Sequence, residues 1–190
     1  MVAAVLLYRG RYRGSCRERS RWLPILTLLA AVLYPVLSPA ALPDRIGEPH
    51  FFPLPPLVLP DETGKKVDLA SFRGRVVLVN FWATWCPPCV EEFPSMQRLK
   101  TALGREGLEI LAVNAGEESD QVFSFTGVLE TEIDFPVLYD TDMEIADAWG
   151  IRALPITIVV DRHGRGVYRV TGGRQWDSEN IRQALRKLLE

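Results

Sequence analysis

Hydrophobic residues form three long runs in the body of the chain, and each run is almost free of charge. They cover residues 75–82 (RVVLVNFW), 108–114 (LEILAVN) and 156–161 (ITIVVD). Continuous apolar runs of this length, rich in Val, Ile and Leu, are typical of strands buried on both faces of a sheet. Shorter strands are expected at residues 57–59, 65–69, 135–139 and 166–171, with hairpin turns at DETG (61–64) and RHGR (162–165).

Helix-forming residues at a helical period alternate with these strands. The predicted helices cover residues 88–103, 119–129, 143–149 and 179–190. Gly104 and Gly150 are expected to end the first and third, while Ser119 or Asp120 and Asp177 or Ser178 supply N-caps for the second and fourth. This alternation, closed by a hairpin, predicts an α/β fold with a mixed central β-sheet flanked by helices.

The N-terminal part of the chain has a different pattern. Residues 1–21 contain six arginines and one acidic residue, and the 22 residues that follow, 22–43, are all uncharged. About 20 apolar residues can cross a bilayer as a helix, and the arginines before them favour a cytoplasmic N-terminus. We therefore predict a cytoplasmic basic segment at 1–21, followed at 22–42 by a transmembrane anchor or a signal peptide cleaved near Ala40. A buried core helix is disfavoured because the run is apolar all round and contains Pro35.

Prolines separate this segment from the body, with six among the 18 residues 43–60. Such a stretch favours an extended chain, so we predict a Pro-rich linker at 43–56 and a single domain at 57–190. The chain has 190 residues, of which 47% are hydrophobic and 24% charged, which is the composition of a globular protein.

The charge and the cysteine content exclude two classes of function. The chain carries a net charge of −2 although residues 1–21 contribute +5, so the remainder carries −7 and offers no basic stripe for nucleic acid. Three cysteines are too few for a disulfide scaffold. Cys16 lies on the predicted cytoplasmic side as a free thiol, whereas Cys86 and Cys89 lie in the exported part, where nearby cysteines are oxidised by default.

The stretch FWATWCPPCVEEFP (81–94) places Cys86 after a strand and at the start of a helix. Unpaired N–H groups and the positive dipole end at a helix N-terminus favour a thiolate, and only the thiolate attacks a disulfide. Cys89, three residues later, can then resolve the mixed disulfide. Pro87 and Pro88 have no N–H with which to stabilise the thiolate, which favours a reductase over an oxidase.

Two other uses of this pair are disfavoured but stay as alternatives at this point. Zinc usually needs a second Cys or His pair, but the body contains only His50 and His163, both expected at the surface, so we predict no metal site. A purely structural disulfide is the second alternative.

The stretch VVLVNFWATWCPPCVEEFP resembles the TlpA/ResA-like branch of the thioredoxin superfamily. Supporting matches are VNAGE (113–117), FPVLYDTD (135–142) and GIRALPITIVVD (150–161), and the resemblance covers residues 43–190. It implies a thioredoxin-like fold with an N-terminal hairpin and a helix–strand insertion at about 116–139. It also implies thiol–disulfide exchange, often on apocytochrome c before haem attachment.

Several roles follow from this resemblance. Pro155 matches the family's cis-proline, which would place the Leu154 backbone against a substrate chain, and Pro94 matches a helix-kinking proline. Glu92 matches an acid one turn beyond Cys89 that could exchange protons with it, unless it is an ordinary solvated glutamate.

Other positions are read as supporting or structural. Glu91 is expected at the surface, and Glu117 is a weaker second candidate or a structural residue. Many thioredoxins carry a buried aspartate where this chain has Asn80, which cannot take up a proton. Trp82 is expected in the core, and Trp85 at the rim, in reach of the substrate.

We therefore predict an extracytoplasmic thiol–disulfide oxidoreductase, anchored in the cell membrane or cleaved and soluble, with its domain facing the periplasm or cell exterior. Cys86 would be the nucleophile, Cys89 the resolving thiol and Glu92 the proton-transfer group, with no cofactor beyond the Cys86–Cys89 disulfide. Expected partners are a membrane thiol donor and a protein disulfide, with apocytochrome c as the family-level substrate. The predicted substrate-binding residues are Trp85, Pro87, Pro88, Leu154 and Pro155.

Three other functions remain as alternatives. A thiol peroxidase would use a lone activated cysteine, with nearby Thr and Arg. A copper-delivery module would need a histidine near the pair. A scaffold domain would keep its disulfide closed.

Overall fold

The computed structural model describes residues 45–126 and 132–190. The segments predicted at 1–21 and 22–42 lie outside these residues, as does the end of the helix predicted at 119–129. In chain order the elements are β1 (Val58–Pro60), β2 (Lys66–Asp68), η2 (Leu69–Phe72), β3 (Val76–Trp82), α2 (Pro87–Leu103), η3 (Gly104–Glu106), β4 (Leu108–Ala115), α3 (Ser119–Thr126), β5 (Val137–Asp140), α4 (Glu144–Ala148), β6 (Ile156–Val160), β7 (Gly166–Thr171) and α5 (Glu179–Leu189).

A mixed five-stranded sheet forms the centre of the domain, in the strand order β5-β4-β3-β6-β7. Strand β3 pairs in parallel with β4 and antiparallel with β6 over most of its length, and all seven of its residues are buried. Strand β5 extends the sheet beyond β4, and with α3 it forms the predicted helix–strand insertion. The prediction of a mixed central sheet is confirmed.

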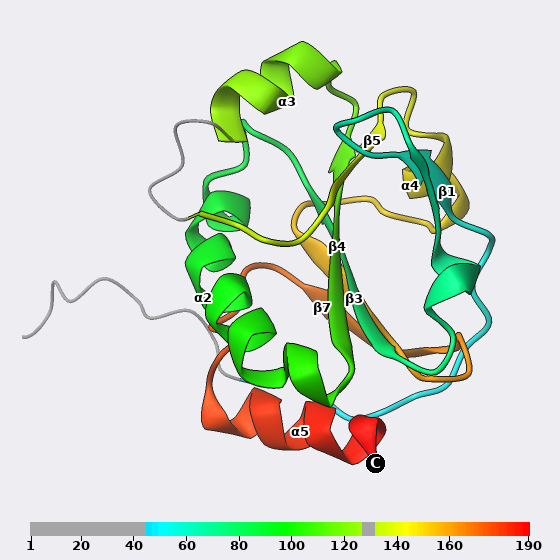
Figure 1. The fold of residues 1–190 in the computed structure, drawn as a ribbon, viewed down its shortest axis with the longest axis vertical. Coiled ribbons are helices and arrows are strands. Elements are labelled where there is room, and N and C mark those ends of the chain that lie inside the picture. The colour runs from blue at the N-terminus through cyan, green and yellow to red at the C-terminus, as the bar shows by residue number, and fades with distance from the viewer. Residues whose placement is uncertain (1–44, 127–131) are drawn as a thin grey trace, which may run out of the picture. The chain divides into compact units, whose positions relative to one another are not determined.

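Alternation along β3 divides the core into two layers. Leu78 and Trp82 face the layer that contains the buried side chains of α2 and α5, whereas Val77 and Phe81 face the layer beneath β1 and α4. Figure 1 shows α2 and α5 on one side of the sheet and β1 and α4 on the other. The side chain of Asn80 has the same parity as Leu78 and Trp82, so it faces α2.

The predicted N-terminal hairpin forms a sheet of its own, in which β1 pairs antiparallel with β2. The Asp61 carboxylate closes the turn by accepting hydrogen bonds from the backbone N–H groups of Thr63 (2.9 Å) and Lys65 (3.0 Å). Asp61 also forms an isolated antiparallel bridge with Leu138 of β5, so the hairpin touches one edge of the central sheet.

The chain before β1 lies along the other edge. Phe52 exchanges two backbone hydrogen bonds with Gly166 of β7, both 2.9 Å long, and the His50 N–H donates to Val167 O at 2.8 Å. The Ile46 side chain is buried. Residues 46–52, predicted as part of an extended linker, are therefore packed against the domain and pair with the first residues of β7.

Three of the four helices end or begin near the predicted signals, whereas the N-cap predicted at Ser119 or Asp120 is wrong, because α3 begins at Ser119 and both residues lie inside it. Helix α2 ends at Leu103, but Gly104 keeps a right-handed φ of −59° and the chain continues into η3. The left-handed residue that turns the chain toward β4 is Gly107, with φ of 104°. At α5, Ser178 is the N-cap, and its side chain accepts a hydrogen bond from Ile181 N–H. Within the described residues no helix is long and apolar enough to span a membrane.

Substitution of Gly166 tests the packing of the N-terminal segment. A Cβ atom at this position would overlap the ring of Phe52. We expect Gly166→Ala to lower the free energy of unfolding by roughly 1–3 kcal/mol, because the ring must move off the sheet edge. Urea unfolding measures the change.

Gly104→Ala is the matched control for this substitution. The backbone of Gly104 is helical, and the added methyl would meet only the Lys100 side chain, at 3.5 Å. It should leave the stability unchanged or raise it by about 0.4–1 kcal/mol. Equal unfolding midpoints for the two variants would contradict the assigned contact.

Candidate active site

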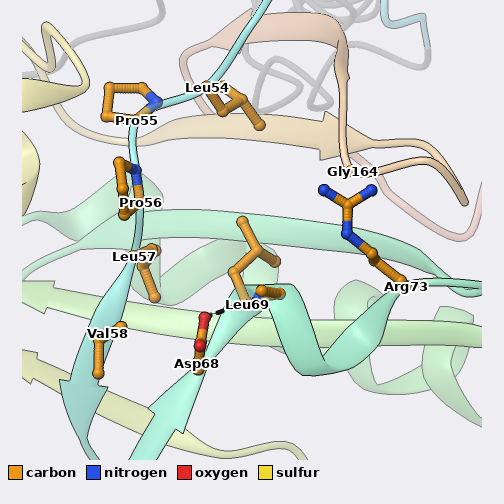
Figure 2. A pocket seen from close by; sticks show the side chains of 10 residues that line it. Leu54, Pro55, Pro56, Leu57, Val58, Asp68, Leu69, Arg73 and Gly164 are labelled. Carbon is orange, nitrogen blue, oxygen red and sulfur yellow. Dashed lines mark hydrogen bonds between the residues drawn. The ribbon is translucent and has the colours of Figure 1, made fainter.

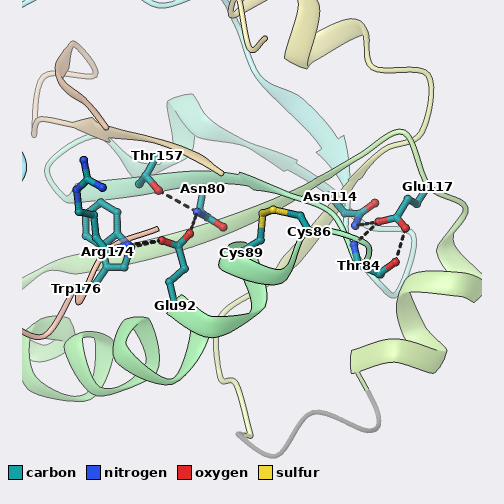
Figure 3. Close-up of a disulfide and its surroundings, with 10 residues drawn as sticks. All are labelled: Asn80, Thr84, Cys86, Cys89, Glu92, Asn114, Glu117, Thr157, Arg174 and Trp176. Carbon is teal, nitrogen blue, oxygen red and sulfur yellow. Dashed lines mark hydrogen bonds between the residues drawn. A yellow bond between two sulfur atoms is a disulfide. The ribbon is translucent and has the colours of Figure 1, made fainter. Parts of the chain in front are cut away.

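Cys86 and Cys89 form a disulfide where β3 gives way to α2, with an S–S distance of 2.02 Å. Cys86 is the N-cap residue of α2, and Cys89 lies in its first turn. Both cysteines are buried, and Cys86 is the slightly more exposed residue, at 4% against 0% for Cys89. The strand, loop and helix thus place the pair at the end of the sheet, as shown in Figure 3.

The first turn of α2 offers few donors to a Cys86 thiolate. Pro87 and Pro88 occupy the first two helical positions and have no N–H. The N–H of Cys89, the next in line, donates to the Cys86 carbonyl oxygen at 3.0 Å. The Cys86 side chain accepts no capping hydrogen bond. This geometry supports the sequence argument that the prolines withhold stabilisation from the thiolate.

Glu92 lies one turn beyond Cys89 and is fully buried, at 0% exposure. Its Oε1 accepts a hydrogen bond from Asn80 Nδ2 at 2.7 Å. Its Oε2 accepts from Trp176 Nε1 at 2.9 Å and from the Arg174 backbone N–H at 3.1 Å. The carboxylate is therefore held by β3 on one side and by the loop before α5 on the other.

Burial raises the pKa of Glu92 from 4.5 to about 7 in the oxidised protein. The hydrogen bonds from Trp176, Arg174 and Asn80 and the charge of Arg174 act against this shift but do not cancel it. Interpretation of Glu92 as a solvated helix glutamate is therefore wrong, whereas its neighbour Glu91 is exposed as predicted. The role of Glu92 in proton transfer stays a prediction.

Glu117 lies on the other flank of the disulfide, where it holds the loop that leads to Cys86 (Figure 3). It accepts hydrogen bonds from Thr84 N–H (2.7 Å), Thr84 Oγ1 (2.5 Å), Asn114 Nδ2 (2.7 Å) and Gln121 Nε2 (3.0 Å). A carboxylate with four donors is well suited to fix a loop. This arrangement favours the structural interpretation of Glu117.

The predicted substrate-binding residues come from two parts of the chain, the loop and helix start around Cys86 and the segment before β6. Trp85 is 67% exposed, and Pro87 and Pro88 are exposed beside Cys86. The Leu154–Pro155 peptide bond is cis, as the family resemblance implied. Because Ile156 pairs with Phe81, Pro155 comes opposite the end of β3 that leads into the Cys86 loop.

Trp82 is buried and packs edge-to-face on Phe93, with ring centroids 4.8 Å apart. Its prediction as a core residue is confirmed.

Several residues of this site were missed by the sequence analysis. Trp176, Arg174 and Thr157 are more than 60 residues away from Glu92 or Asn80 in the chain, and no local pattern connects them. The available signal was indirect, since a polar residue such as Asn80 in an otherwise apolar strand needs a partner. Asn114, near the end of the next strand, carries the same signal.

A surface groove lies apart from the disulfide. A groove of about 310 Å³ runs between residues 54–58 and η2, with Arg73 at one end (Figure 2), and none of the predicted site residues lines it.

Among residues 45–126 and 132–190 no three His, Cys, Asp or Glu side chains are grouped as a metal site would need. Both histidines are exposed.

Fold and site together define a class. A mixed sheet whose central strand leads into a C-X-X-C disulfide at a helix N-terminus, with a cis-proline at the start of the neighbouring strand, is the arrangement of the thioredoxin-like redox proteins. The redoxin family profile matches residues 49–185, and the chain belongs to this family.

Comparison with known proteins specifies the branch. The chain is 40% identical over 118 residues to thiol-disulfide oxidoreductase ResA of Bacillus subtilis (strain 168). The aligned residues make up 62% of this chain and 65% of that protein. It is 36% identical over 134 residues to ResA of Geobacillus thermodenitrificans (strain NG80-2), covering 70% and 75%. The match to the first relative thus spans just under two thirds of its length.

A solved structure agrees with this result. The crystal structure of a thiol:disulfide interchange protein of the thioredoxin family from Chlorobium tepidum TLS superposes with a TM-score of 0.63 and 25% identity, covering 76% of this chain and 100% of that one. The resemblance to the TlpA/ResA-like branch and the thioredoxin-like fold are confirmed.

The raised pKa of Glu92 predicts a pH dependence of stability. The folded oxidised protein keeps this proton up to about pH 7, whereas the unfolded chain releases it near 4.5. Stability from this group is therefore fully present below about pH 4.5 and is lost as the pH rises to about 7, by roughly 3 kcal/mol in total. Glu92→Gln should remove this slope in urea unfolding at pH 5 and pH 8 with the disulfide intact.

Glu91→Gln is the control, because it neutralises the exposed neighbouring carboxylate. It should leave the wild-type slope in place. An unchanged slope in Glu92→Gln would show that Glu92 is not protonated at neutral pH in the fold.

Proposed function

We propose that this protein is an extracytoplasmic thiol–disulfide oxidoreductase that reduces protein disulfides through Cys86 and Cys89. The observation that carries the proposal is the Cys86–Cys89 pair at the N-terminus of α2, with two prolines in its first turn and a buried carboxyl group one turn further on. Relatives at 33–41% identity are named thiol-disulfide oxidoreductases, which supports the same activity.

The proposed roles follow from the positions of the two cysteines, with Cys86 at the N-cap of α2 and Cys89 fully buried in its first turn. The Cys86 thiolate attacks a substrate disulfide, forming a mixed disulfide and releasing one substrate thiolate. Cys89 then loses its proton and attacks Cys86, so that the Cys86–Cys89 bond forms as the bond to the substrate breaks. The substrate gains two electrons, the protein loses two, and Glu92 is placed to receive the Cys89 proton.

The substrate chain would bind across the exposed rim of the pair. Trp85, Pro87 and Pro88 present apolar surface beside Cys86. The backbone at Leu154, next to Pro155, would supply hydrogen-bonding groups to an extended polypeptide. We propose no cofactor beyond the disulfide and no metal.

The partners and location are proposed from the sequence and the family. A reductase in an oxidising compartment needs a donor, and the predicted apolar segment at 22–42 favours a membrane thiol donor at the same surface. The domain would face the periplasm or the cell exterior, anchored or released by cleavage. Apocytochrome c is the proposed substrate, on the strength of the resemblance to ResA.

Trapping of the mixed disulfide tests the function directly. The full chain with Cys89→Ser, reduced and mixed with a disulfide-bonded polypeptide, should retain the substrate on Cys86, because the resolving thiol is missing. Cys86→Ser should retain much less, since Cys89 is buried. Consumption of peroxide by the wild-type protein without any reaction with protein disulfides would instead support a thiol peroxidase.

The prolines allow a test of the reducing character. Pro88 occupies the second helical position, from which a restored N–H could reach the Cys86 sulfur. A hydrogen bond to a charged group contributes about 1.5–3 kcal/mol, so Pro88→Ala should raise the reduction potential by roughly 30 mV or more. Equilibration with glutathione or dithiothreitol measures the potential.

Pro87→Ala is the matched control, because the first helical N–H is not the usual partner of an N-cap side chain. It should change the potential much less. A wild-type potential near roughly −120 mV, in place of about −270 mV or below, would mean that the protein forms disulfides.

A further inference from the structure

Asn80 has a hydrogen-bonding pattern that the proposed reaction does not yet use. Its side chain is 0% exposed in the middle of β3. Nδ2 donates to Glu92 Oε1 at 2.7 Å and to Thr157 Oγ1 at 2.9 Å, which uses both of its hydrogens. Oδ1 is buried, and within the described part of the chain it has no hydrogen-bond partner.

An acceptor left unpaired in the core costs free energy, so it needs an explanation. In Figure 3 the Asn80 amide lies between the Glu92 carboxylate and the disulfide, and its carbonyl oxygen points to the disulfide side, where Cys89 is the nearer cysteine. A disulfide sulfur has no hydrogen to donate. A reduced Cys89 would carry one.

The orientation of the amide is set by its neighbours. A half-turn of the Asn80 amide would point Oδ1 at a Glu92 oxygen, and two acceptors cannot form a hydrogen bond. When Glu92 is ionised, the amide therefore keeps its N–H side toward the carboxylate. The groups in contact with Glu92 are the neutral Asn80 side chain from the sheet and the Trp176 indole and Arg174 backbone N–H from the loop before α5, and Arg174 is the charged residue that acts on it. The hydroxyl group of Thr157 contacts the other hydrogen of the Asn80 amide.

We propose that Asn80 is a positioning residue that links Glu92 to Cys89, donating its N–H to the Glu92 carboxylate while its carbonyl oxygen accepts the S–H of reduced Cys89. The inference rests on the proposed oxidoreductase function and deepens it. In the oxidised protein the acceptor is empty, and reduction fills it. The Cys89 proton is thereby held on the side of Glu92 until the mixed disulfide is resolved.

The same amide can accommodate the state after proton transfer. Once the proton has left the Cys89 sulfur and reached Glu92, a half-turn of the amide lets its carbonyl oxygen accept from the Glu92 O–H and its N–H donate to the Cys89 thiolate. Thr157 suits both orientations, because a hydroxyl group can accept or donate. The thiolate then attacks Cys86, and the substrate sulfur leaves with the electron pair of the broken bond.

The experiment measures the pKa of Glu92 in the oxidised and the reduced full chain, in detergent micelles, by NMR of labelled glutamate carboxyl carbons. A Cys89 S–H bound to Asn80 strengthens the orientation that stabilises ionised Glu92. Reduction should therefore lower the pKa of Glu92, by roughly half a unit. A Cys86 thiolate formed on reduction can only raise the pKa of Glu92, because like charges repel. A net decrease on reduction therefore cannot come from the thiolate.

Variants at two positions complete the test. Asn80→Leu should abolish the decrease or reverse its sign, and Thr157→Val should weaken it, whereas Thr157→Ser, which keeps the hydroxyl, should preserve it. If a variant does not fold, the sign of the wild-type shift still decides. An unchanged or higher Glu92 pKa in the reduced wild-type protein would overturn the inference and leave the proposed function intact. A disulfide that dithiothreitol cannot open would instead overturn the proposed function.

Discussion

A carboxyl group in the core is the constraint on which the arrangement of this site depends. Glu92 is removed from water, and its two oxygens are satisfied by β3 and by the loop before α5. A carboxyl group without hydrogen-bond partners is costly to bury in either form, and an ionised one far more so. The fold must therefore bring Asn80, Trp176 and the Arg174 backbone to one point, and in doing so it fixes α2 against the central strand directly behind Cys89.

The two acidic residues beside the disulfide are supported in different ways. Glu117 accepts hydrogen bonds from residues in and next to the Cys86 loop, among them the backbone N–H and the hydroxyl group of Thr84. Glu92 is bound by side chains and backbone that also belong to the packed core. One acid therefore holds the shape of the loop, while the other lies one turn beyond the buried Cys89, with which we propose that it exchanges a proton.

The sequence was sufficient for the framework and insufficient for these contacts, for a physical reason. Continuous apolar runs identify β3, β4 and β6 because burial on both faces leaves no alternating pattern, and Ser178 identifies the start of α5 because its cap is local. The partners of Glu92 depend on which distant segments meet, and no local signal encodes that meeting. Residues 46–52 illustrate the same limit, because prolines indicate an extended chain but not that it pairs with β7.

Coverage of the sheet edges has a consequence for selectivity. Phe52 pairs with Gly166, the first residue of β7, and Asp61 pairs with Leu138 of β5, so part of each outer sheet edge is covered. This cover shortens the unpaired stretch of each edge strand and so reduces non-specific association through the sheet edges. Under the proposed function, an extended client chain would bind instead at the short backbone stretch around Leu154 and the apolar rim beside Cys86. Recognition would then depend on the few residues that flank a client's own cysteines and much less on its length or its tendency to form strands.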